Sequence, residues 1–541
     1  MKLYEYINAC LRQYGCRQAF GVPGSLIMPV WQNLPDIQLT LCSHEQEAGY
    51  VASGYAKASG ELTAVITTGS PGVANSVTGI AGANMDSVPL ICISGKTDQR
   101  LCNTGMRQEE SRTNRNFEST DLMTPITKRS LEITDIQTAA EQFRLCCQAA
   151  VTGRAGSVHV CIPQNLQTME LPPLALSAHN TAEAVSIPPM PAFRRPLIIM
   201  GWGCWMARAA DAVYELAQRI NAPILVTSKA YCCIRRDHPL YAGKLGYGYN
   251  PCLERFLREY SPDRVLSFGC SMSRKDISPS CAAILEKASV HVYTRESGDV
   301  RIHSPSASVH ETADLSGLLR HWLGSGAEAG PDTELYRKIA QCNAEQAQYF
   351  RSVMEPTDTM ARAMDAMGCL GDGITLTADA GNNLLNAAVL YTPTEIGGMF
   401  LNDGIRSMGS GICETVGMAI ADPSRYYIAV VGDGGMLMNG NVMYLAGTLK
   451  LPIAFAVVNN TSLGRVRVGQ TVMGQFIGSD LGNVDFTLYA RAFGLAASRT
   501  DDVNELIDLL RSAAADRQAV LLELVTPKDE IPLKLKLEGV Y

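Results

Sequence analysis

Several features are missing or scarce in this sequence of 541 residues. No apolar run approaches the roughly 20 residues that a membrane-spanning helix needs, so we expect no transmembrane segment. The net charge of −7 is mild for a chain of this length, which argues against nucleic acid as a partner. None of the eight histidines follows His321, so the last part of the chain offers no imidazole acid or base.

Cysteine is plentiful, with seventeen residues, but the spacing typical of metal and redox sites is absent. No two cysteines stand in a Cys-x-x-Cys pattern, and the close pairs Cys146-Cys147 and Cys232-Cys233 are adjacent. Free cysteine in apolar runs behaves as a small hydrophobic residue. Because Leu3 to Tyr14 has the pattern of an amphipathic helix and not of a secretory leader, we expect a protein of the reducing cytoplasm.

Apolar runs alternate with helical stretches through most of the chain, which indicates an α/β protein. The length suggests about three or four domains at roughly 150 residues each. Proline-rich segments at Pro172-Pro173 and 188–191, and a glycine- and serine-containing segment at 323–327, read as linkers. We therefore predict three domains, at residues 1–172, 190–324 and 334–541.

The stretch from Arg425 to Gly464 carries the clearest chemical pattern. An apolar run over 426–431 ends in Gly432-Asp433-Gly434-Gly435, a helix-permitting segment follows, and a second apolar run over 453–458 ends in Asn459-Asn460. This pattern predicts strand, loop, helix, strand and loop, with both loops at the same edge of a parallel sheet. Open α/β sheets place ligands at that edge.

Asp433 and Asn460 would therefore meet, and their oxygen atoms suit a hard cation such as Mg²⁺ or Ca²⁺. Mg²⁺ held by so few protein groups completes its octahedron with water and phosphate oxygens. The glycines on either side of Asp433 let backbone amides approach those phosphates. The alternative is an ordinary tight turn after a buried strand, which the Asn-Asn pair 27 positions beyond Asp433 makes less attractive.

This motif resembles the diphosphate motif of the thiamine diphosphate enzymes, in which GDG is followed after such a spacer by NN. The resemblance implies that Asp433, the side chain of Asn460 and the main-chain carbonyl of Ser462 bind Mg²⁺. It also implies a set of residues around the cofactor in the third domain: Arg406, Met408, Gly432, Gly434, Gly435, Leu463 and Gly464.

The resemblance extends over nearly the whole chain and is closest to acetolactate synthase-like enzymes. In the first domain it rests on segments 20–24, 69–75, 86–90 and 126–128 with His44-Glu45, and in the second on Arg195-Pro196 and 237–240. It implies three doubly wound parallel-sheet domains, named pyrimidine-binding, central and diphosphate-binding. It further implies a homodimer or homotetramer, with each active site between the first domain of one subunit and the third domain of another.

Glu45 is the predicted catalytic residue. In the family a glutamate at this position hydrogen-bonds to N1′ of the aminopyrimidine ring and relays a proton, while the cofactor supplies the carbanion chemistry. The alternative is a solvated acid in the first turn of a helix, stabilised by the helix dipole. We expect Glu47 to be such an ordinary acid. Gly72 and Asn75, in the loop at 69–75, complete the predicted cofactor contacts.

Met408 and Arg406, which both precede the GDG motif, have roles that the resemblance alone implies. Met408 stands where the family places a bulky apolar residue under the cofactor; the alternative is a core methionine. The backbone carbonyl of Arg406 matches the group that accepts a hydrogen bond from the cofactor's 4′-amino group. Relatives commonly have glycine at position 406.

Candidate substrate contacts are Ser25, Arg107, Gln108, Lys128, Arg465 and Arg467. Ser25 also suits a helix N-cap and Lys128 a surface lysine. Acetolactate synthases carry Phe, Met and Trp where this chain has Arg107, Arg465 and Gly469, which argues against acetohydroxyacid synthesis proper. Arg107, Arg465 and Arg467 could instead recognise an extra anionic group on the substrate. The alternative is that these arginines are simply exposed to solvent. FAD is not expected, because Trp202 and Trp205 are bulky where a phosphate would need small residues.

We therefore predict a carboligase dependent on thiamine diphosphate and Mg²⁺, which decarboxylates a 2-oxo acid and transfers the acyl group to an acceptor carbonyl. One alternative is a simple 2-oxo acid decarboxylase that releases an aldehyde. A second, from another class, is a non-catalytic relative that binds the cofactor as a structural or regulatory partner. The presence of Glu45, Asp433 and Asn460 together argues against the second alternative.

Overall fold

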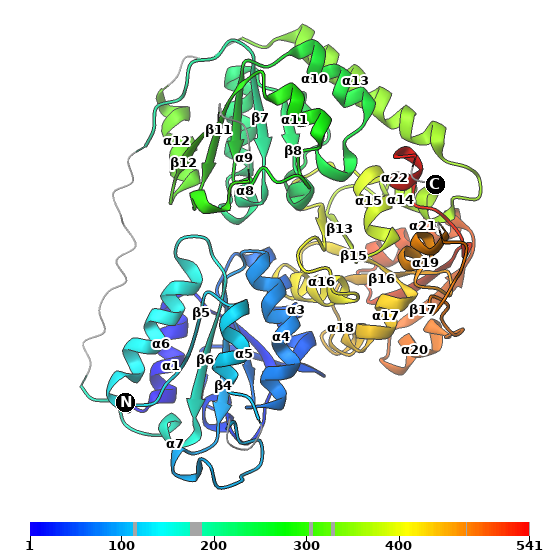
Figure 1. Ribbon diagram of the computed structural model, residues 1–541. Helices are drawn as coiled ribbons and strands as arrows, with labels where there is room; N and C mark the ends of the chain where they lie inside the picture. Colours follow the sequence, from blue (N-terminus) through cyan, green and yellow to red (C-terminus); the bar gives the residue numbers. More distant parts are fainter. Residues whose placement is uncertain (112–115, 174–186, 302–306, 326–329, 472, 540–541) are drawn as a thin grey trace.

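The protein is represented by a computed structural model, which describes residues 1–111, 116–173, 187–301, 307–325, 330–471 and 473–539. Three six-stranded sheets, every strand parallel to its neighbours, form the centre of three α/β units (Figure 1). The predicted fold class is confirmed. The domain boundaries stay predictions, since parts of both expected linkers lie outside the described residues. No helix in the described part is long and apolar enough to cross a bilayer, and all seventeen cysteines are free thiols.

The first sheet has the strand order β2-β1-β3-β4-β6-β5. Its central strands are buried along their whole length, as expected where helices cover both faces of a parallel sheet. The strands are β1 (Gln18–Val22), β2 (Gln38–Leu41), β3 (Thr63–Thr67), β4 (Leu90–Lys96), β5 (Arg129–Glu132) and β6 (Ser157–Pro163). The helices are α1 (Leu3–Gln13), α2 (Met28–Trp31), α3 (Glu45–Ser59), α4 (Pro71–Met85), α5 (Ser119–Met123), α6 (Ile136–Val151) and α7 (Gln164–Gln167).

The second sheet, in the central unit, has the order β12-β11-β10-β7-β8-β9. Its strands are β7 (Pro196–Met200), β8 (Ile224–Val226), β9 (Tyr241–Lys244), β10 (Arg264–Phe268), β11 (Ser289–Thr294) and β12 (Ala307–Glu311). Its helices are α8 (Trp202–Met206), α9 (Ala210–Ile220), α10 (Pro251–Tyr260), α11 (Pro279–Leu285) and α12 (Leu315–Ser325).

The third sheet has the order β14-β13-β15-β16-β18-β17, so the strand order reverses between β13 and β15. Its strands are β13 (Ile374–Ala378), β14 (Met399–Leu401), β15 (Tyr426–Gly432), β16 (Ile453–Asn459), β17 (Ala496–Thr500) and β18 (Val520–Val525). Its helices are α13 (Thr333–Val353), α14 (Thr359–Met367), α15 (Asn382–Leu390), α16 (Ser410–Ala421), α17 (Asp433–Asn439), α18 (Met443–Thr448), α19 (Gly464–Thr471), α20 (Phe486–Ala492), α21 (Val503–Ala515) and α22 (Leu533–Leu537).

Helices α3 and α16 join the first unit to the third. Glycine allows this close crossing, because a Cβ atom at Gly417 would lie 1.9 Å from the carbonyl oxygen of Val51, and one at Gly54 equally close to that of Glu414. The small residues between Ala48 and Ser59 therefore allow close helix packing. One hydrophobic cluster runs from this junction through all three sheets.

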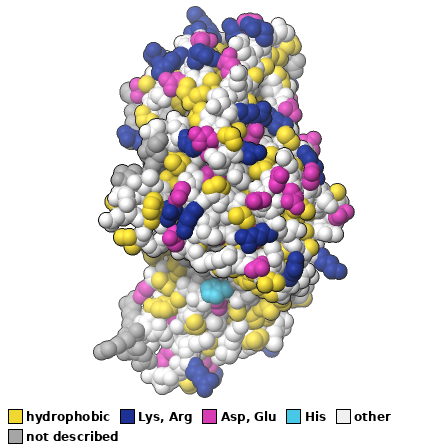
Figure 2. Space-filling model, turned by 90° about the vertical axis from the view of Figure 1, so that its right-hand side faces the viewer, with side chains coloured by type: hydrophobic (Ala, Val, Ile, Leu, Met, Phe, Trp, Pro, Cys, Tyr) yellow, Lys and Arg dark blue, Asp and Glu magenta, His cyan; other side chains and the backbone are white. Residues whose placement is uncertain are grey.

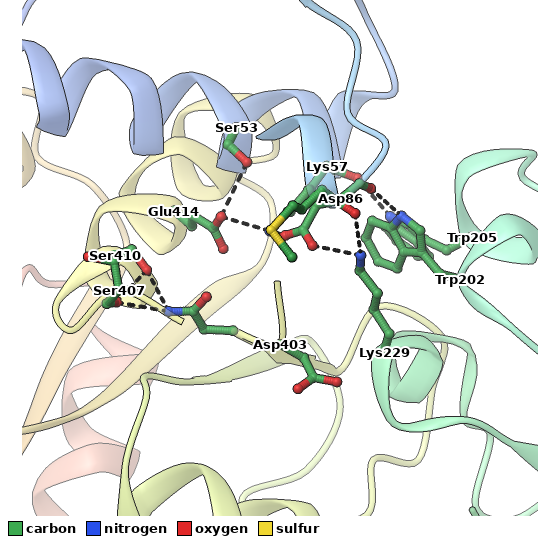
Figure 3. A network of polar contacts seen from close by, with 12 residues as sticks. Ser53, Lys57, Asp86, Trp202, Trp205, Lys229, Asp403, Ser407, Ser410 and Glu414 are labelled. Carbon is green, nitrogen blue, oxygen red and sulfur yellow. Dashed lines mark hydrogen bonds and ion pairs between the residues drawn. The ribbon is translucent and has the colours of Figure 1, made fainter. Parts of the chain in front are cut away.

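A buried charge cluster fastens the same junction (Figure 3). The Lys57 ammonium lies 2.6 Å from the Asp86 carboxylate and 2.7 Å from that of Glu414. Burial opposes ionisation of Asp86, but Lys229 and Lys57 outweigh it and lower the pKa of that carboxyl. Because Lys229 belongs to the central unit and lies 2.6 Å from Asp86, the cluster links all three units. Removal of one partner from such a cluster leaves an unpaired buried charge, which costs about 3–5 kcal/mol.

Candidate functional site

The predicted metal-binding residues lie in two segments, 432–435 and 459–462. These segments meet at the carboxyl ends of β15 and β16, which pair in parallel with Gly432 opposite Val458. Asp433 is the first residue of α17, and not part of a loop as predicted. Its carboxylate accepts hydrogen bonds from the amides of Gly434 (2.8 Å) and Ser462 (3.1 Å). The Ser462 amide also donates to Oδ1 of Asn460, at 3.2 Å. Asp433, Asn460 and Ser462 are thus brought together.

Burial changes the acidity of the Asp433 carboxyl. It raises the pKa of Asp433 to about 6, although the surrounding backbone amides act in the opposite direction. A divalent cation would favour the ionised form, because an opposite charge nearby lowers a carboxyl pKa. The donor set of carboxylate, amide and carbonyl oxygens fits Mg²⁺.

A cavity of about 320 Å³ adjoins this oxygen cluster. It lies where the order of the third sheet reverses, the position at which doubly wound sheets bind ligands. Its lining comes from the third unit, and the residues are Met360, Ala380, Gly381, Asn382, Asn383, Arg406, Met408, Gly432, Asp433, Gly434, Gly435, Val458, Asn460, Ser462, Leu463, Gly464, Arg465 and Val466. All of the cofactor-contact residues predicted in the third domain line this cavity.

Two lining residues, Asn382 and Asn383, were missed by the sequence analysis. Both are buried, and in the described part of the chain both polar atoms of the Asn382 side chain and Oδ1 of Asn383 lack a hydrogen-bond partner. Buried polar groups normally find partners, so these atoms indicate a polar ligand. The available signal was Gly381-Asn382-Asn383, which begins three residues after the end of the buried strand β13.

Met408 and the glycine at 434 shape another wall of the cavity. A Cβ atom at Gly434 would lie 2.9 Å from the methyl carbon of Met408 and 2.7 Å from Leu463, so a larger residue would fill the space. Met408 is half-buried, and its carbonyl accepts a hydrogen bond from Asn439 at 3.1 Å. The cavity thus combines three features: asparagine polar atoms without partners among the described residues, a cluster of oxygen ligands, and open space beside Gly434. Together they fit a diphosphate-bearing cofactor with its cation.

Glu45 lies apart from this cavity within one chain. It begins α3, is buried, and accepts a hydrogen bond from Asn75 on α4 at 3.0 Å. Gly72 lies in the first turn of α4, so the three predicted residues of the first domain sit together at the carboxyl edge of the first sheet. No residue of this group lines the cavity of the third unit.

Glu47 differs from the prediction of an ordinary solvated acid. It is only 1% exposed and accepts hydrogen bonds from Ser43 and from Asn441, the latter at 2.7 Å. Burial raises its pKa, while the hydrogen bonds from Ser43 act in the opposite direction. Because Asn441 belongs to the third unit, Glu47 helps to join the first and third units.

The predicted substrate contacts are scattered within one chain. Ser25 is exposed and does not cap α2, whose N-cap is Ile27. Gln108 accepts a hydrogen bond from Thr68 at 3.0 Å, and Arg107 beside it is exposed. Lys128 precedes β5, so it lies at the amino edge of the first sheet, opposite to Glu45. Its ammonium donates to the carbonyls of Thr152 and Arg154.

Of the two arginines on α19, only Arg465 lines the cavity. It is exposed and has no ion-pair partner in the described part of the chain. Arg467 instead binds Asp480 (2.9 Å) and Asp529 (2.6 Å) and stacks over Phe476. Arg467 is therefore committed to contacts within the chain, whereas Arg465 can meet a ligand.

The loop after β7, where the bulky Trp202 and Trp205 argued against a flavin dinucleotide, leads directly into α8. Helix α8 has five residues, and its two indoles are tied to the first unit: Trp202 donates to the carbonyl of Asp86 and Trp205 to that of Lys57, each at 2.7 Å. A cavity of about 290 Å³ beside it is lined by Trp202 and by charged groups such as Arg154, which is paired with Asp299. The expectation that FAD is not bound stays a prediction.

The fold and this site define an α/β protein with a ligand cavity, suited to a phosphate and a hard cation, at the edge of its last sheet. Three family models match the chain: the N-terminal thiamine pyrophosphate binding domain (residues 1–116), the central domain (191–311) and the C-terminal thiamine pyrophosphate binding domain (379–524) of thiamine pyrophosphate enzymes. The chain belongs to the thiamine pyrophosphate enzyme family.

Similar proteins agree with this assignment. The chain is 27% identical to the acetolactate synthase isozyme 1 large subunit of Escherichia coli K12, covering 96% of this chain and 91% of that protein. It is 25% identical to the probable acetolactate synthase large subunit of Methanocaldococcus jannaschii, covering 98% and 93%. The solved structure of Rhodococcus jostii RHA1 thiamine diphosphate-dependent 4-hydroxybenzoylformate decarboxylase has the same fold, with a TM-score of 0.81, 19% identity and coverage of 98% and 100%.

Proposed function

We propose that this protein is a carboligase dependent on thiamine diphosphate and Mg²⁺, which decarboxylates a 2-oxo acid and joins the acyl group to an acceptor carbonyl. The observation that carries the proposal is the meeting of Asp433, Asn460 and Ser462 in a cavity where side-chain polar atoms of Asn382 and Asn383 have no hydrogen-bond partner among the described residues. The similarity to acetolactate synthase large subunits supports the reaction type.

The residues would divide the work as follows. Asp433, the Asn460 side chain and the Ser462 carbonyl would hold Mg²⁺, and Asn382, Asn383 and nearby amides would bind the diphosphate. Bound thiamine diphosphate supplies the carbanion chemistry. Glu45 would hold and return a proton at ring N1′, in a buried position where the carboxyl meets little water.

A second copy of the chain would complete each site. Glu45 and the cavity of the third unit lie apart in one chain, so a homodimer or homotetramer would bring them together. Exposed apolar side chains occur on α17, α18, α19 and α20 and in the segment after α19, and the face in Figure 2 shows apolar side chains interspersed with charged ones. They include Leu437, Met438, Tyr444, Val466, Met473, Phe476, Ile477 and Leu488. Apolar surface of this kind is typical of a protein interface.

The test is a screen of 2-oxo acids with thiamine diphosphate and Mg²⁺, read by CO₂ release and by product mass. A carboligase gives an acyloin or a 2-hydroxy-2-alkyl acid, and Glu45→Gln abolishes CO₂ release. Absence of CO₂ release from every 2-oxo acid would contradict the proposal and would favour a non-catalytic relative, with which the buried Glu45 and the intact metal set disagree.

Arg465 favours a second candidate, a decarboxylase that releases an aldehyde from a substrate with an additional anionic group. Its guanidinium lines the cavity without an acidic partner in the described residues, and such a group binds carboxylate or phosphate in a bidentate manner. The same screen decides between the candidates: a free aldehyde from a dicarboxylic 2-oxo acid, and loss of that preference in Arg465→Gln but not in Arg511→Gln, would select this one.

A further inference from the structure

The loop between β14 and α16, residues 402–409, is held by all three units. It carries Arg406 and Met408, both of which line the cavity. From its own unit, the Asp379 carboxylate accepts hydrogen bonds from the amides of Gly409 (2.8 Å) and Gly411 (2.9 Å). From the first unit, Asp86 lies against Gly404. Figure 3 shows Asp86, Lys229 and Asp403 at this junction.

The central unit contacts the loop through Lys275 and Tyr247. The ammonium of Lys275 lies 2.5 Å from the Asp403 carboxylate and donates to the Asp403 carbonyl at 2.8 Å. The Asp403 side chain is fully buried, so its charge needs this partner. Tyr247 accepts a hydrogen bond from Arg406, and the guanidinium lies 5.4 Å from the centre of the tyrosine ring.

Arg406 has a backbone conformation that its side chain must maintain. Its φ is +58°, in the left-handed region that non-glycine residues rarely adopt. The guanidinium is bound to Asp403 from the same loop as well as to Tyr247. Since the left-handed conformation costs free energy in a residue other than glycine, these side-chain bonds help to offset that cost.

We propose that Lys275, Tyr247, Asp403 and Arg406 form a latch by which the central unit fixes the 402–409 loop in the shape that receives the coenzyme. The four are positioning residues: they act through the Arg406 carbonyl and the Met408 side chain. The inference rests on the proposed function only in taking the cavity as the coenzyme site. It gives the central unit a role in the reaction although none of its described residues lines the cavity.

The latch is separate from the contacts that hold the central and third units together. The buried ammonium of Lys244 donates to the carbonyls of Ala388 and Tyr391, Arg236 donates to that of Thr392, and the Gly397 amide donates to Cys232. These bonds do not involve the 402–409 loop. Loss of the latch should therefore loosen the loop and leave the unit interface in place.

The test compares Lys275→Met and Tyr247→Phe with Arg236→Gln, a matched change at the same unit interface but outside the latch. Hydrogen exchange is measured in protein free of coenzyme, followed by titration with thiamine diphosphate and Mg²⁺. In the two latch variants we expect exchange in residues 402–409 to rise about fivefold or more, and coenzyme affinity to fall about tenfold, with exchange elsewhere unchanged. Lys275→Arg, which keeps the charge, should recover most of the affinity.

Two results would overturn the latch. One is unchanged hydrogen exchange in residues 402–409 in both latch variants. The other is a rise in exchange that is spread equally over the central and third units, the same pattern that Arg236→Gln gives, which would indicate ordinary interface packing. Failure of the proposed function is recognised separately. A wild-type chain that takes up no coenzyme with Mg²⁺ contradicts that function, whereas the exchange measurement on coenzyme-free protein still decides the latch.

Discussion

Asp433 combines two properties at the edge of the third sheet: it is buried, and its carboxylate is held by backbone amides close to Asn460. Such a carboxylate is costly without a cation, because burial opposes its charge. The unpartnered polar atoms of Asn382 and Asn383 lie on the wall of the same cavity. At the scale of single residues, the buried carboxylate and these polar atoms fit the cation and the phosphate group of the proposed coenzyme.

The first prediction concerns this carboxylate. Asp433→Asn keeps the size of the side chain but removes the charge that would hold Mg²⁺ in the proposed site, so the affinity for thiamine diphosphate with Mg²⁺ should fall by about 100-fold. Quenching of intrinsic fluorescence during coenzyme titration measures it. Asp501→Asn, at an exposed position, serves as the control. Equal affinities of the two variants would show that Asp433 does not bind the cation.

The second prediction concerns Lys244, whose ammonium donates to the carbonyls of Ala388 and Tyr391 and has no acidic neighbour among its hydrogen-bond partners. Burial lowers its pKa to about 7, from the usual value near 10.5. Between these values the unfolded chain binds more protons than the folded chain, so the folded state gains stability as the pH rises. The burial penalty is complete below about pH 7 and disappears near pH 10.5.

Relative to Lys244→Met, the wild type should therefore gain up to about 1.4 kcal/mol of unfolding free energy per pH unit between pH 7 and 9. Denaturant titrations of both proteins at the two pH values measure this difference. The exposed Lys338→Met variant should show no such trend. A difference between wild type and Lys244→Met that does not depend on pH would contradict the shifted pKa.

At the scale of secondary-structure elements, the crossing of α3 and α16 depends on the absence of two side chains. Gly417→Ala would place a methyl carbon 1.9 Å from a backbone carbonyl oxygen, which cannot move without displacing α3. We expect a loss of about 1–3 kcal/mol of unfolding free energy or more. Urea denaturation measures it. Gly324→Ala on α12, where no atom lies within 4 Å, should be neutral or slightly stabilising; equal effects of the two changes would contradict the packing argument.

The sequence could reveal the strands and part of the site, but not the contacts made between distant segments. Apolar runs predicted the buried strands β15 and β16, since both faces of a parallel sheet are covered. The order Gly-Asp-Gly and Asn-Asn at strand ends predicted which residues meet, because strand polarity alone brings them together. The sequence could not show that Arg467 forms ion pairs within the chain while Arg465 lines the cavity. The partners of Arg467, Asp480 and Asp529, lie in other segments of the chain. Likewise, the contact of Glu47 with Asn441 follows from packing between units.

For the whole molecule, the separation of Glu45 from the cavity leads to a prediction about assembly. If one chain provides Glu45 and another provides Asp433, then Glu45→Gln and Asp433→Asn chains, each inactive alone, should recover part of the activity when they are unfolded and refolded together. CO₂ release before and after mixing measures the recovery, and native mass spectrometry counts the chains. Recovery that fails although mixed oligomers form would place both residues in a site built by one chain.

The Lys57 cluster has a consequence for how the chain is made. Lys57 is synthesised 357 residues before Glu414, one of the two acids that neutralise it. On the ribosome the first sheet can therefore be completed while α3 still exposes Gly54 and an incompletely neutralised Lys57 ammonium to solvent. A nascent chain with such an unfinished surface is a natural client for chaperones until translation of the last third supplies α16.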